Sequence, residues 1–379
     1  ENIGSPRAIC VFMLLRARED SQYLDLSIDP SHYTDPYRFR DDYLVTEILR
    51  KNPRLEIPTD PEAEAKKRFS EAEELCRNTN LRLSDLSQAL QGADADVRRL
   101  VLNAQANINR ILGPLTRSKL SYAEREMRFG PGSTTSLSGV VTQGRKYSRR
   151  FHDATPRILD FRTFCFPQAL TGGADIRLRR SSKLRIVPKT AKTGRAICIE
   201  PDLNIFVQLG TGALLRKQLA DFGLDLSSQE LNQELARLGS IHDHLCTMDL
   251  SSASDTISRE TVWALLPYDW ADLLHFSRVD YVSTDEKEEI SLNKWSSMGN
   301  GYTFELETLI FYGVLLGACD DFGYGYDLVN AYGDDLVFPS EFEDVIRRTL
   351  EFLGFKVNTR KTFGKGSFRE SCGTDWFQG

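Results

Sequence analysis

The sequence predicts an α+β fold, in which a helical N-terminal part precedes an antiparallel sheet that is backed by helices. Apolar residues recur at helical spacing within residues 60–112, which indicates amphipathic helices there. Between about residues 240 and 366, the patterns follow the order strand, helix, loop, helix, hairpin, helix, strand. With 379 residues, of which 41% are hydrophobic, the chain is long enough for two or more subdomains around sizeable cores.

Start and stop signals mark the helices of the N-terminal part. Residues 60–64, Asp-Pro-Glu-Ala-Glu, form a strong helix start, and this helix is expected to reach about Arg77. A second helix is expected from Asp94 to the Gly-Pro pair at 113–114. Its apolar stripe is more typical of a protein core than of a binding groove. Residues 128–150 predict a basic loop, which either lies near nucleic acid or is simply solvated.

An acidic hairpin is predicted around Tyr332-Gly333-Asp334-Asp335, because apolar stretches at 326–331 and 336–338 flank this turn. Gly333 supplies the permissive backbone that a tight turn needs. Two neighbouring carboxylates are therefore expected on a sharp bend beside a buried sheet. Such like charges repel each other, and divalent cations would relieve the repulsion. An acidic hairpin tip in solvent is the simpler alternative.

A third carboxylate, Asp249, ends a short strand that is predicted at residues 244–250. Small residues follow it, and then a helical run from about Ser258 to Leu266, which Pro267 stops. An acid at the end of a core strand can face an acidic hairpin on the neighbouring strand. Three carboxylates that converge in this way suit two magnesium ions. For Asp249 alone, a helix-capping role is the alternative.

A small, glycine-rich loop at residues 295–302 lies between these two acidic segments and leads into an apolar helix that is expected to reach about Gly317. Such a loop lets the backbone approach a nucleotide closely, although the loop taken alone favours an ordinary helix start. Apolar spacing predicts further helices over residues 205–219 and 341–353.

A cluster of basic residues stands out against the net charge of −6. It predicts a hairpin with strands at 185–189 and 195–199, and cations on one of its faces could hold triphosphates or an RNA backbone. A solvated basic hairpin is the alternative. The cluster comprises Arg177, Arg179, Arg180, Lys183, Arg185, Lys189, Lys192 and Arg195.

In this order, the motifs resemble those of template-dependent RNA polymerases, and more narrowly the replicases of levivirus or Q-beta-type single-stranded RNA bacteriophages. The resemblance is carried by residues 76–80, 128–132, 186–193, 199–201, 249–255, 296–306, 332–335 and 368–373. It implies a right-hand polymerase fold. The N-terminal region and helix-rich fingers would span 1–240 with a basic hairpin for nucleotide entrance at 177–200, and the palm would span 241–366 with a fingers insertion at about 268–295. The start of the primer-grip and thumb region would span 367–379, with the thumb mostly missing.

The resemblance also implies roles for individual residues. Asp249, Asp334 and Asp335 would be catalytic ligands of two Mg²⁺ ions, which Mn²⁺ could replace, and Leu250 would lend a backbone carbonyl. Lys361, with Lys356 as the alternative, would donate a proton to pyrophosphate. Nucleotide binding would fall to Lys189, Lys192, Arg195, Ser254, Asp255, Ser297, Gly299, Asn300 and Thr303. RNA binding would fall to Arg185, Gly333, Phe368, Arg369, Ser371 and Cys372.

Two positions depart from the wider polymerase pattern. Ser254 stands where many viral polymerases have a second acid, and Asp255 follows one position later. Glu307 stands where many have asparagine. The segment 250–254 contains no aromatic side chain to exclude a 2′-hydroxyl, which disfavours a reverse transcriptase.

The implied function is RNA-templated RNA synthesis that replicates a single-stranded RNA phage genome, by attack of an RNA 3′-hydroxyl on a nucleoside triphosphate. The alternatives are a reverse transcriptase or other DNA-making palm enzyme, and a non-catalytic RNA-binding protein. The implied partners are template and nascent RNA, NTPs, host elongation factors Tu and Ts, and a ribosomal protein. The implied place is the cytoplasm of the infected bacterial host.

The remaining signals concern compartment and completeness. The scattered cysteines suggest free thiols in a reducing compartment, and His242 with His244 lacks further metal ligands at suitable spacing. The longest apolar run, residues 8–15, is too short to span a membrane. The resemblance implies a turn at residues 368–372 under the primer terminus, after which relatives continue into a helical thumb. Because the chain starts at Glu1 without methionine and stops at Gly379, just past this turn, we expect a truncated protein.

Overall fold

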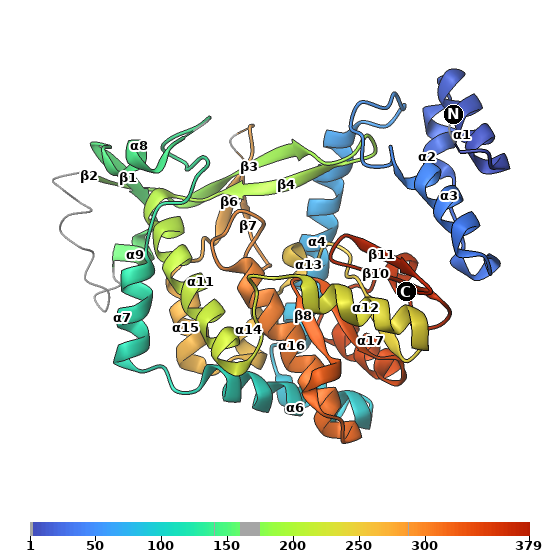
Figure 1. Ribbon diagram of the computed structural model, residues 1–379. Coiled ribbons are helices and arrows are strands. Elements are labelled where there is room, and N and C mark those ends of the chain that lie inside the picture. The colour runs from blue at the N-terminus through green and yellow to red at the C-terminus, as the bar shows by residue number, and fades with distance from the viewer. Residues whose placement is uncertain (1–2, 140, 160–174, 287) are drawn as a thin grey trace.

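The structure, a computed structural model, describes residues 3–139, 141–159, 175–286 and 288–379 (Figure 1). Helices and strands are mixed throughout these residues, as the α+β prediction requires. The main hydrophobic core of the protein joins the long helices to the sheet that carries the acidic hairpin. Among the described residues, no helix is both long and apolar enough to cross a membrane.

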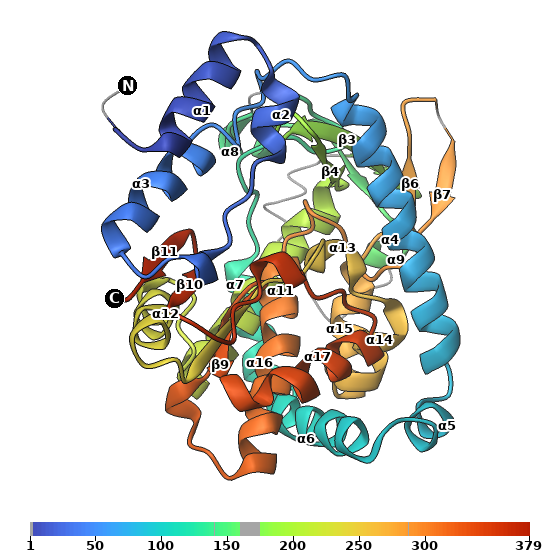
Figure 2. The ribbon, with the colours of Figure 1, turned by 90° about the vertical axis from the view of Figure 1, so that its right-hand side faces the viewer.

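The first helices form a small unit beside the rest of the chain, and they are α1 (Pro6–Arg16), α2 (Asp20–Asp25), η1 (Pro30–His32) and α3 (Pro36–Glu47). Their core includes Val11 and Tyr23, and it also takes in Ala191 from the turn of the basic hairpin. Figure 2 shows α3 next to the C-terminal strands, where Phe39 stacks on Phe377 with ring centres 4.3 Å apart. This unit therefore touches both the basic hairpin and the end of the chain.

The next helices are α4 (Pro61–Leu83), α5 (Leu86–Gln91), α6 (Ala95–Leu112) and α7 (Arg117–Glu126), and the predicted starts of α4 and α6 are confirmed. The side chain of Asp60 caps α4 by accepting a hydrogen bond from the backbone of Glu62. The helix continues past the expected end at Arg77, because its later residues pack against the C-terminal half of the molecule. Nδ2 of Asn80 there donates a 2.8 Å hydrogen bond to the carbonyl of Asn293.

Two small sheets lie in the upper part of the molecule in Figure 1. Their strands are β1 (Phe151–Ala154), β2 (Asp175–Leu178), β3 (Ser181–Pro188), β4 (Gly194–Ile199), β6 (Tyr281–Ser283) and β7 (Glu289–Ser291), and the short helices α8 (Gln143–Tyr147) and α9 (Pro156–Leu159) precede and follow β1 in the chain. One sheet has the order β4-β3-β6-β7, and β1 pairs with β2. The predicted basic hairpin is confirmed, with Val187 opposite Arg195. The hairpin of β6 and β7 was not predicted.

The C-terminal half of the molecule is built around the sheet β5-β9-β8. Its strands are β5 (Leu245–Met248), β8 (Asn330–Tyr332) and β9 (Asp335–Pro339). The helices are α11 (Asp202–Phe222), α12 (Glu230–His242), α13 (Ala253–Thr256), α14 (Arg259–Leu265), α15 (Tyr268–Ser277), α16 (Thr303–Phe322) and α17 (Glu343–Phe352). The chain ends with β10 (Phe368–Ser371) and β11 (Thr374–Phe377). Because α16 is buried on nearly all sides, its apolar run needs no polar face.

Three local predictions were wrong in detail. Residues 326–328 form a 3-10 helix, η2 (Tyr326–Leu328), instead of the start of a strand. The strand expected after α17 is reduced to isolated bridges at Val357 and Phe363, separated by the 3-10 helix η4 (Thr359–Lys361). The turn expected at residues 368–372 is mostly strand β10, and it turns only at Cys372 and Gly373, which both have positive φ.

The described cysteines are free thiols, as predicted, and Cys165 lies outside the described residues. Burial raises the pKa of the Cys76 and Cys198 thiols to about 12, so these groups are inert. The described residues also contain no group of three or more His, Cys, Asp or Glu side chains that is arranged to hold a metal ion. His242 and His244 therefore form no such site with a third side chain.

Candidate catalytic site

The register of the sheet brings the three predicted carboxylates to one end. β5 and β9 are antiparallel, with Met248 opposite Leu336. One residue further along this register, Asp249 comes opposite Asp335. Tyr332 pairs with Asp335 across the hairpin, so Asp334 lies in the turn between them. Residues that are far apart in the sequence therefore present three acids at the same edge, as the strand and hairpin patterns predicted.

The turn is seated on helix α16. The backbone N–H of Gly333 donates a 3.0 Å hydrogen bond to Oγ1 of Thr308. Gly333 has a φ of +60°, and a Cβ placed there would lie 2.7 Å from the ring of Phe304. Both facts require glycine at this position. The seat holds the two acids of the hairpin in a fixed place relative to α16.

The three carboxylates share a half-buried, mutually repulsive environment. Burial raises the pKa of Asp335 to about 6, and the charges of Asp334 and Asp249 add to this rise. Burial also raises the pKa of Asp249, against a 2.7 Å hydrogen bond from Nδ2 of Asn358 that favours its ionised form. Burial likewise raises the pKa of Asp334, which the nearby cations oppose. Clustered carboxylates with raised pKa values are typical of sites that bind cations.

Three of the predicted cations act on these acids. Lys189 and Arg195 both lower the pKa of Asp334 by their charge, and both are exposed side chains. No hydrogen bond or ion pair engages either side chain within the described ranges, so both are free to meet an anion. Lys361 pairs with Glu370 at 2.5 Å. Although burial lowers its pKa, the charges of Glu370, Asp249 and Asp335 outweigh burial and raise it.

Other predicted cations are directed elsewhere, so the basic segment does not form one face. Lys192 makes a 2.7 Å ion pair with Asp25 of α2. Arg185 pairs with Asp285 in the turn between β6 and β7. Sequence spacing could not separate these residues from Lys189, because their partners come from distant segments.

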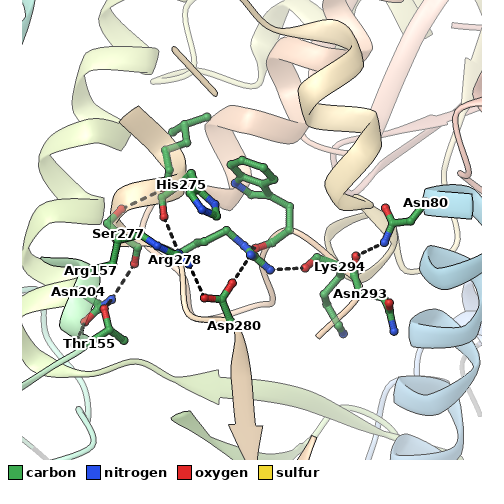
Figure 3. Close-up of polar contacts among 12 residues, drawn as sticks. Asn80, Thr155, Arg157, Asn204, His275, Ser277, Arg278, Asp280, Asn293 and Lys294 are labelled. Atoms are coloured by element: carbon green, nitrogen blue, oxygen red, sulfur yellow. Dashed lines mark hydrogen bonds and ion pairs between the residues drawn. The ribbon is translucent and has the colours of Figure 1, made fainter. Parts of the chain in front are cut away.

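Asp255, predicted to bind nucleotide, points into a buried ionic network. Its Oδ1 forms a 3.0 Å ion pair with Nζ of Lys294. Lys294 is fully buried and also forms an ion pair with Glu73 of α4 at 3.5 Å. The backbone carbonyl of Lys294 accepts a hydrogen bond from the buried Arg278, which pairs with Asp280 (Figure 3). In this structure Asp255 therefore joins α4 to the C-terminal half of the molecule. Its role as a nucleotide ligand remains a prediction.

Figure 3 shows how far this network extends. On one side, Nδ2 of Asn80 in α4 donates a 2.8 Å hydrogen bond to the carbonyl of Asn293. On the other side, Asp280 pairs with Arg157 of α9 at 2.7 Å. The network thus ties α4 and α9 to the segment that precedes the glycine-rich loop.

The glycine-rich loop is docked on the edge of β4. Its Met298 carbonyl accepts a 2.8 Å hydrogen bond from the backbone N–H of Cys198. Gly299 has a φ of +110°, and a Cβ there would lie 2.2 Å from the carbonyl oxygen of Cys198. The loop is closed internally, because the carbonyl of Ser297 accepts from the N–H of Asn300 at 3.1 Å. The hydroxyl of Thr303 is buried and bonds to Ser296 at 2.8 Å.

Glu307 is a residue near the site that the sequence did not assign. Ser254 donates a 2.6 Å hydrogen bond to its Oε2, and its Oε1 would lie 3.2 Å from a Cβ on Gly333. Burial raises the pKa of Glu307 to about 8, and the charge of Asp334 adds to the rise. The one feature of the sequence that could have pointed to Glu307 as a site residue was its departure from the wider polymerase pattern.

Helix α12 and the C-terminal hairpin both contact Asp335. Asn232 donates to the carbonyl of Asp335 at 3.0 Å and to the hydroxyl of Ser371 at 3.2 Å. The backbone of Cys372 hydrogen-bonds to the Asp335 side chain and thereby favours its ionised form. Arg369 is fully buried, and its Nε donates to the carbonyl of Leu245.

Several residues that were predicted to bind RNA are therefore inside the protein. Phe368 packs in an aromatic cluster that includes Phe39 and Phe363. With Arg369 and Ser371 also buried, β10 positions the acids in this structure and does not present these side chains to a ligand.

The donor set fits a hard divalent cation, although no complete ligand cage is preassembled. Carboxylate oxygens are the ligands that Mg²⁺ prefers, and it usually keeps waters in its shell. Burial raises the pKa of all three acids, and a bound cation would favour their ionised forms. Leu250 is buried beside Asp249 and bridges to Val357.

Comparisons with known proteins point to viral RNA polymerases. The family model described as RNA replicase, beta-chain, matches residues 13–379. The RNA-directed RNA polymerase subunit beta of Enterobacteria phage SP is 39% identical over 344 residues, which cover 90% of this chain and 59% of that protein. The corresponding subunit of Escherichia virus Qbeta is 36% identical over 362 residues, which cover 93% of this chain and 60% of that protein.

The chain thus spans about three fifths of the length of these relatives. Among solved structures, the RNA-dependent RNA polymerase of a human picorbirnavirus has a TM-score of 0.48 at 12% identity, over 91% of this chain and 77% of that chain. A likeness at that level supports no argument about function.

Proposed function

The chain belongs to the RNA replicase beta-chain family, and we propose that it synthesises RNA on an RNA template in the replication of a single-stranded RNA phage genome. The observation that carries the proposal is the meeting of Asp249, Asp334 and Asp335 at one edge of a sheet. Lys189 and Arg195 act on these acids from the basic hairpin. Carboxylates opposite free cations suit phosphoryl transfer, in which positioning and charge neutralisation dominate.

Asp249, Asp334 and Asp335 would hold two Mg²⁺ ions, with the Leu250 carbonyl as a further oxygen ligand, and Mn²⁺ would substitute. When bound, the ions would lower the pKa of the attacking 3′-hydroxyl and neutralise charge on the leaving pyrophosphate. The hydrogen bond from Asn358 orients Asp249. The seat of Gly333 on Thr308 fixes the acids of the hairpin.

The cations would handle the triphosphate. Lys189 and Arg195 would bind its oxygens, because both are exposed and near Asp334. Lys361 would donate a proton to pyrophosphate, since its raised pKa keeps it protonated at neutral pH. Lys192 would join them only after leaving Asp25.

Ribonucleotides are the proposed substrates. The segment from Leu250 to Ser254 offers small side chains and hydroxyls, which leave room for a 2′-hydroxyl. The loop of Ser297, Gly299 and Asn300 would shape the space around the nascent base pair, and Thr303 would hold that loop in place.

The larger assembly is also proposed from the family. RNA template, nascent RNA and NTPs would be the direct partners, in the cytoplasm of the infected bacterium. Host elongation factors Tu and Ts and a ribosomal protein would bind the protein. The subdomain limits would be fingers at 1–240, palm at 241–366 and primer grip at 367–379, with Gly333 and Cys372 near the primer terminus.

Primer extension tests the proposal. A primed RNA template is incubated with rNTPs or dNTPs, with and without MgCl₂, and with and without the two elongation factors and the ribosomal protein. The expected result is magnesium-dependent extension with rNTPs that D334N abolishes. Equal extension by the unaltered chain and D334N, or a preference for dNTPs, contradicts the proposal.

A further inference from the structure

The arginines at the base of the basic hairpin lie outside the candidate catalytic site. Figure 1 shows β1 and β2 at the opposite end of the β3–β4 hairpin from the N-terminal helices. Strand β3 has 8 residues, which extend about 25 Å. Because Lys189 directly follows this strand, the base of the hairpin is roughly that far from the cation that faces the acids.

Arginines at the base are stacked on aromatic rings. The Cζ atoms of Arg149 and Arg177 lie 4.6 and 4.4 Å from the centre of the Phe151 ring. Arg180 lies 3.7 Å from the centre of the Tyr281 ring. Stacking holds each guanidinium in place and leaves N–H groups for other partners. Two guanidiniums on one ring repel each other, and an anion would relieve that repulsion.

The charges of this surface are largely uncompensated. Arg145, Arg150 and Arg180 are exposed, and their guanidinium groups make no hydrogen bond or ion pair with any described residue. Arg177 has a carboxylate partner, the buried Asp153, at 2.6 Å. Asp175 is an exposed acid nearby, opposite Phe151.

This excess of positive charge affects Lys183, a neighbour in β3. Burial lowers its pKa, and the charges of Arg179, Arg185 and Arg177 lower it further, against the opposing charge of Asp153. A positive surface on a chain of net charge −6 is a local exception that suits a polyanion.

We propose that Arg145, Arg149, Arg150, Arg177 and Arg180, with Phe151, bind the phosphate backbone of single-stranded RNA at a site separate from the candidate catalytic centre. We call this set the arginine surface. Guanidinium groups bind phosphate oxygens through paired N–H donors. Aromatic rings interleaved with cations are typical of single-strand binding, because flexible strands can place phosphates and bases on such a platform. The inference does not depend on catalysis.

The test removes the three exposed, unpaired arginines together. The variant R145A/R150A/R180A is compared with R77A/R98A/R347A, which loses the same charge from α4, α6 and α17. A third variant, R145K/R150K/R180K, keeps the charge. Each protein is titrated into a fluorescein-labelled 12-nucleotide oligouridylate in EDTA, at several NaCl concentrations, and anisotropy is measured. Thermal unfolding of each variant reports that it is folded.

The expected result is a loss of affinity on the order of tenfold for R145A/R150A/R180A, with the slope of log affinity against log salt reduced by about 2, since each phosphate contact to a single strand contributes about 0.7. The lysine variant and the control should stay close to the unaltered chain. Equal affinity and slope for R145A/R150A/R180A and the control overturn the proposal. An equal loss for a duplex RNA of the same length overturns the assignment to single strands. Because EDTA removes divalent metals, the result is independent of polymerase activity.

Discussion

Ser254 donates a 2.6 Å hydrogen bond to the buried carboxyl group of Glu307, and these are the two positions at which the chain departs from the wider polymerase pattern. The contact joins the segment after Asp249 to helix α16, on which the acidic hairpin is seated. The two departures therefore occur as a pair. A serine hydroxyl and a carboxyl group with a raised pKa form this link.

Glu307 should tolerate glutamine and not alanine. Because its pKa is about 8, the group is largely protonated at pH 7, and E307Q keeps an uncharged acceptor for Ser254. E307A removes the support of the hairpin, and displaced catalytic groups can cost about 100-fold in rate. Steady-state primer extension should show kcat reduced by at least about tenfold for E307A, with KM for NTP little changed. Similar kcat values for E307Q and E307A contradict this role.

Gly333 should not tolerate a side chain. In G333A the new methyl group would lie 2.7 Å from the Phe304 ring, at a φ of +60°. We expect a loss of about 1–3 kcal/mol in unfolding free energy and a large loss of extension activity. Gly323 is the matched control, since its φ is +75° and nothing lies within 4 Å of a Cβ there. If urea unfolding and activity are the same for G333A and G323A, the turn is not constrained by α16.

Lys189 and Lys192 should differ, although both belong to the predicted basic cluster. K189A removes a free cation near Asp249 and Asp334, so KM for NTP should rise about tenfold. K192A breaks an exposed ion pair with Asp25, and such pairs contribute little to stability. KM should then change by less than about twofold. A larger effect for K192A would show that Lys192 leaves Asp25 to bind the nucleotide.

Asp335 should make stability depend on pH in the absence of metal. Its pKa is about 6 in the folded chain and near 3.8 when unfolded, so the folded state binds the proton more tightly. Ionisation therefore destabilises the fold, and D335N should be more stable than the unaltered chain by up to about 3 kcal/mol above pH 6. The advantage should shrink as the pH falls from 6 and vanish below about pH 4.

Urea unfolding in EDTA from pH 4 to 8 measures this difference, with D344N, an exposed acid on α17, as the control. A D335N advantage that is constant with pH would exclude the proposed cause.

Lys294 should be a major contributor to stability. K294M leaves Asp255 and Glu73 without their shared cation, and breaking a buried ion pair costs about 3–5 kcal/mol. R77M removes an exposed pair with Glu74 and should cost less than about 1 kcal/mol. Chemical unfolding compares the two variants. If both variants lose the same unfolding free energy, the buried network that joins α4 to the C-terminal half of the molecule does not stabilise the fold.

Short-range signals in the sequence predicted much of the fold. Proline and acidic residues at 60–64 fixed the start of α4, because a helix start depends on groups within one turn. The hairpins at Gly333 and at residues 189–193 followed from strand patterns on both sides of a turn. The register of β5 on β9 was not visible in the sequence, yet it alone decides that Asp249 comes opposite Asp335.

The sequence by itself determined which acids belong together, because strand ends, turns and motif order are properties of neighbouring residues. Only the tertiary structure decided which cations face them. Lys189 and Lys192 lie in one short turn, and a partner from α2 separates their roles. Distant partners also decide the roles of two further residues. Asp255 forms an ion pair with Lys294, and Ser254 donates a hydrogen bond to Glu307. The direction and pKa of a side chain depend on burial and on charges from distant segments, and chain packing alone brings these together.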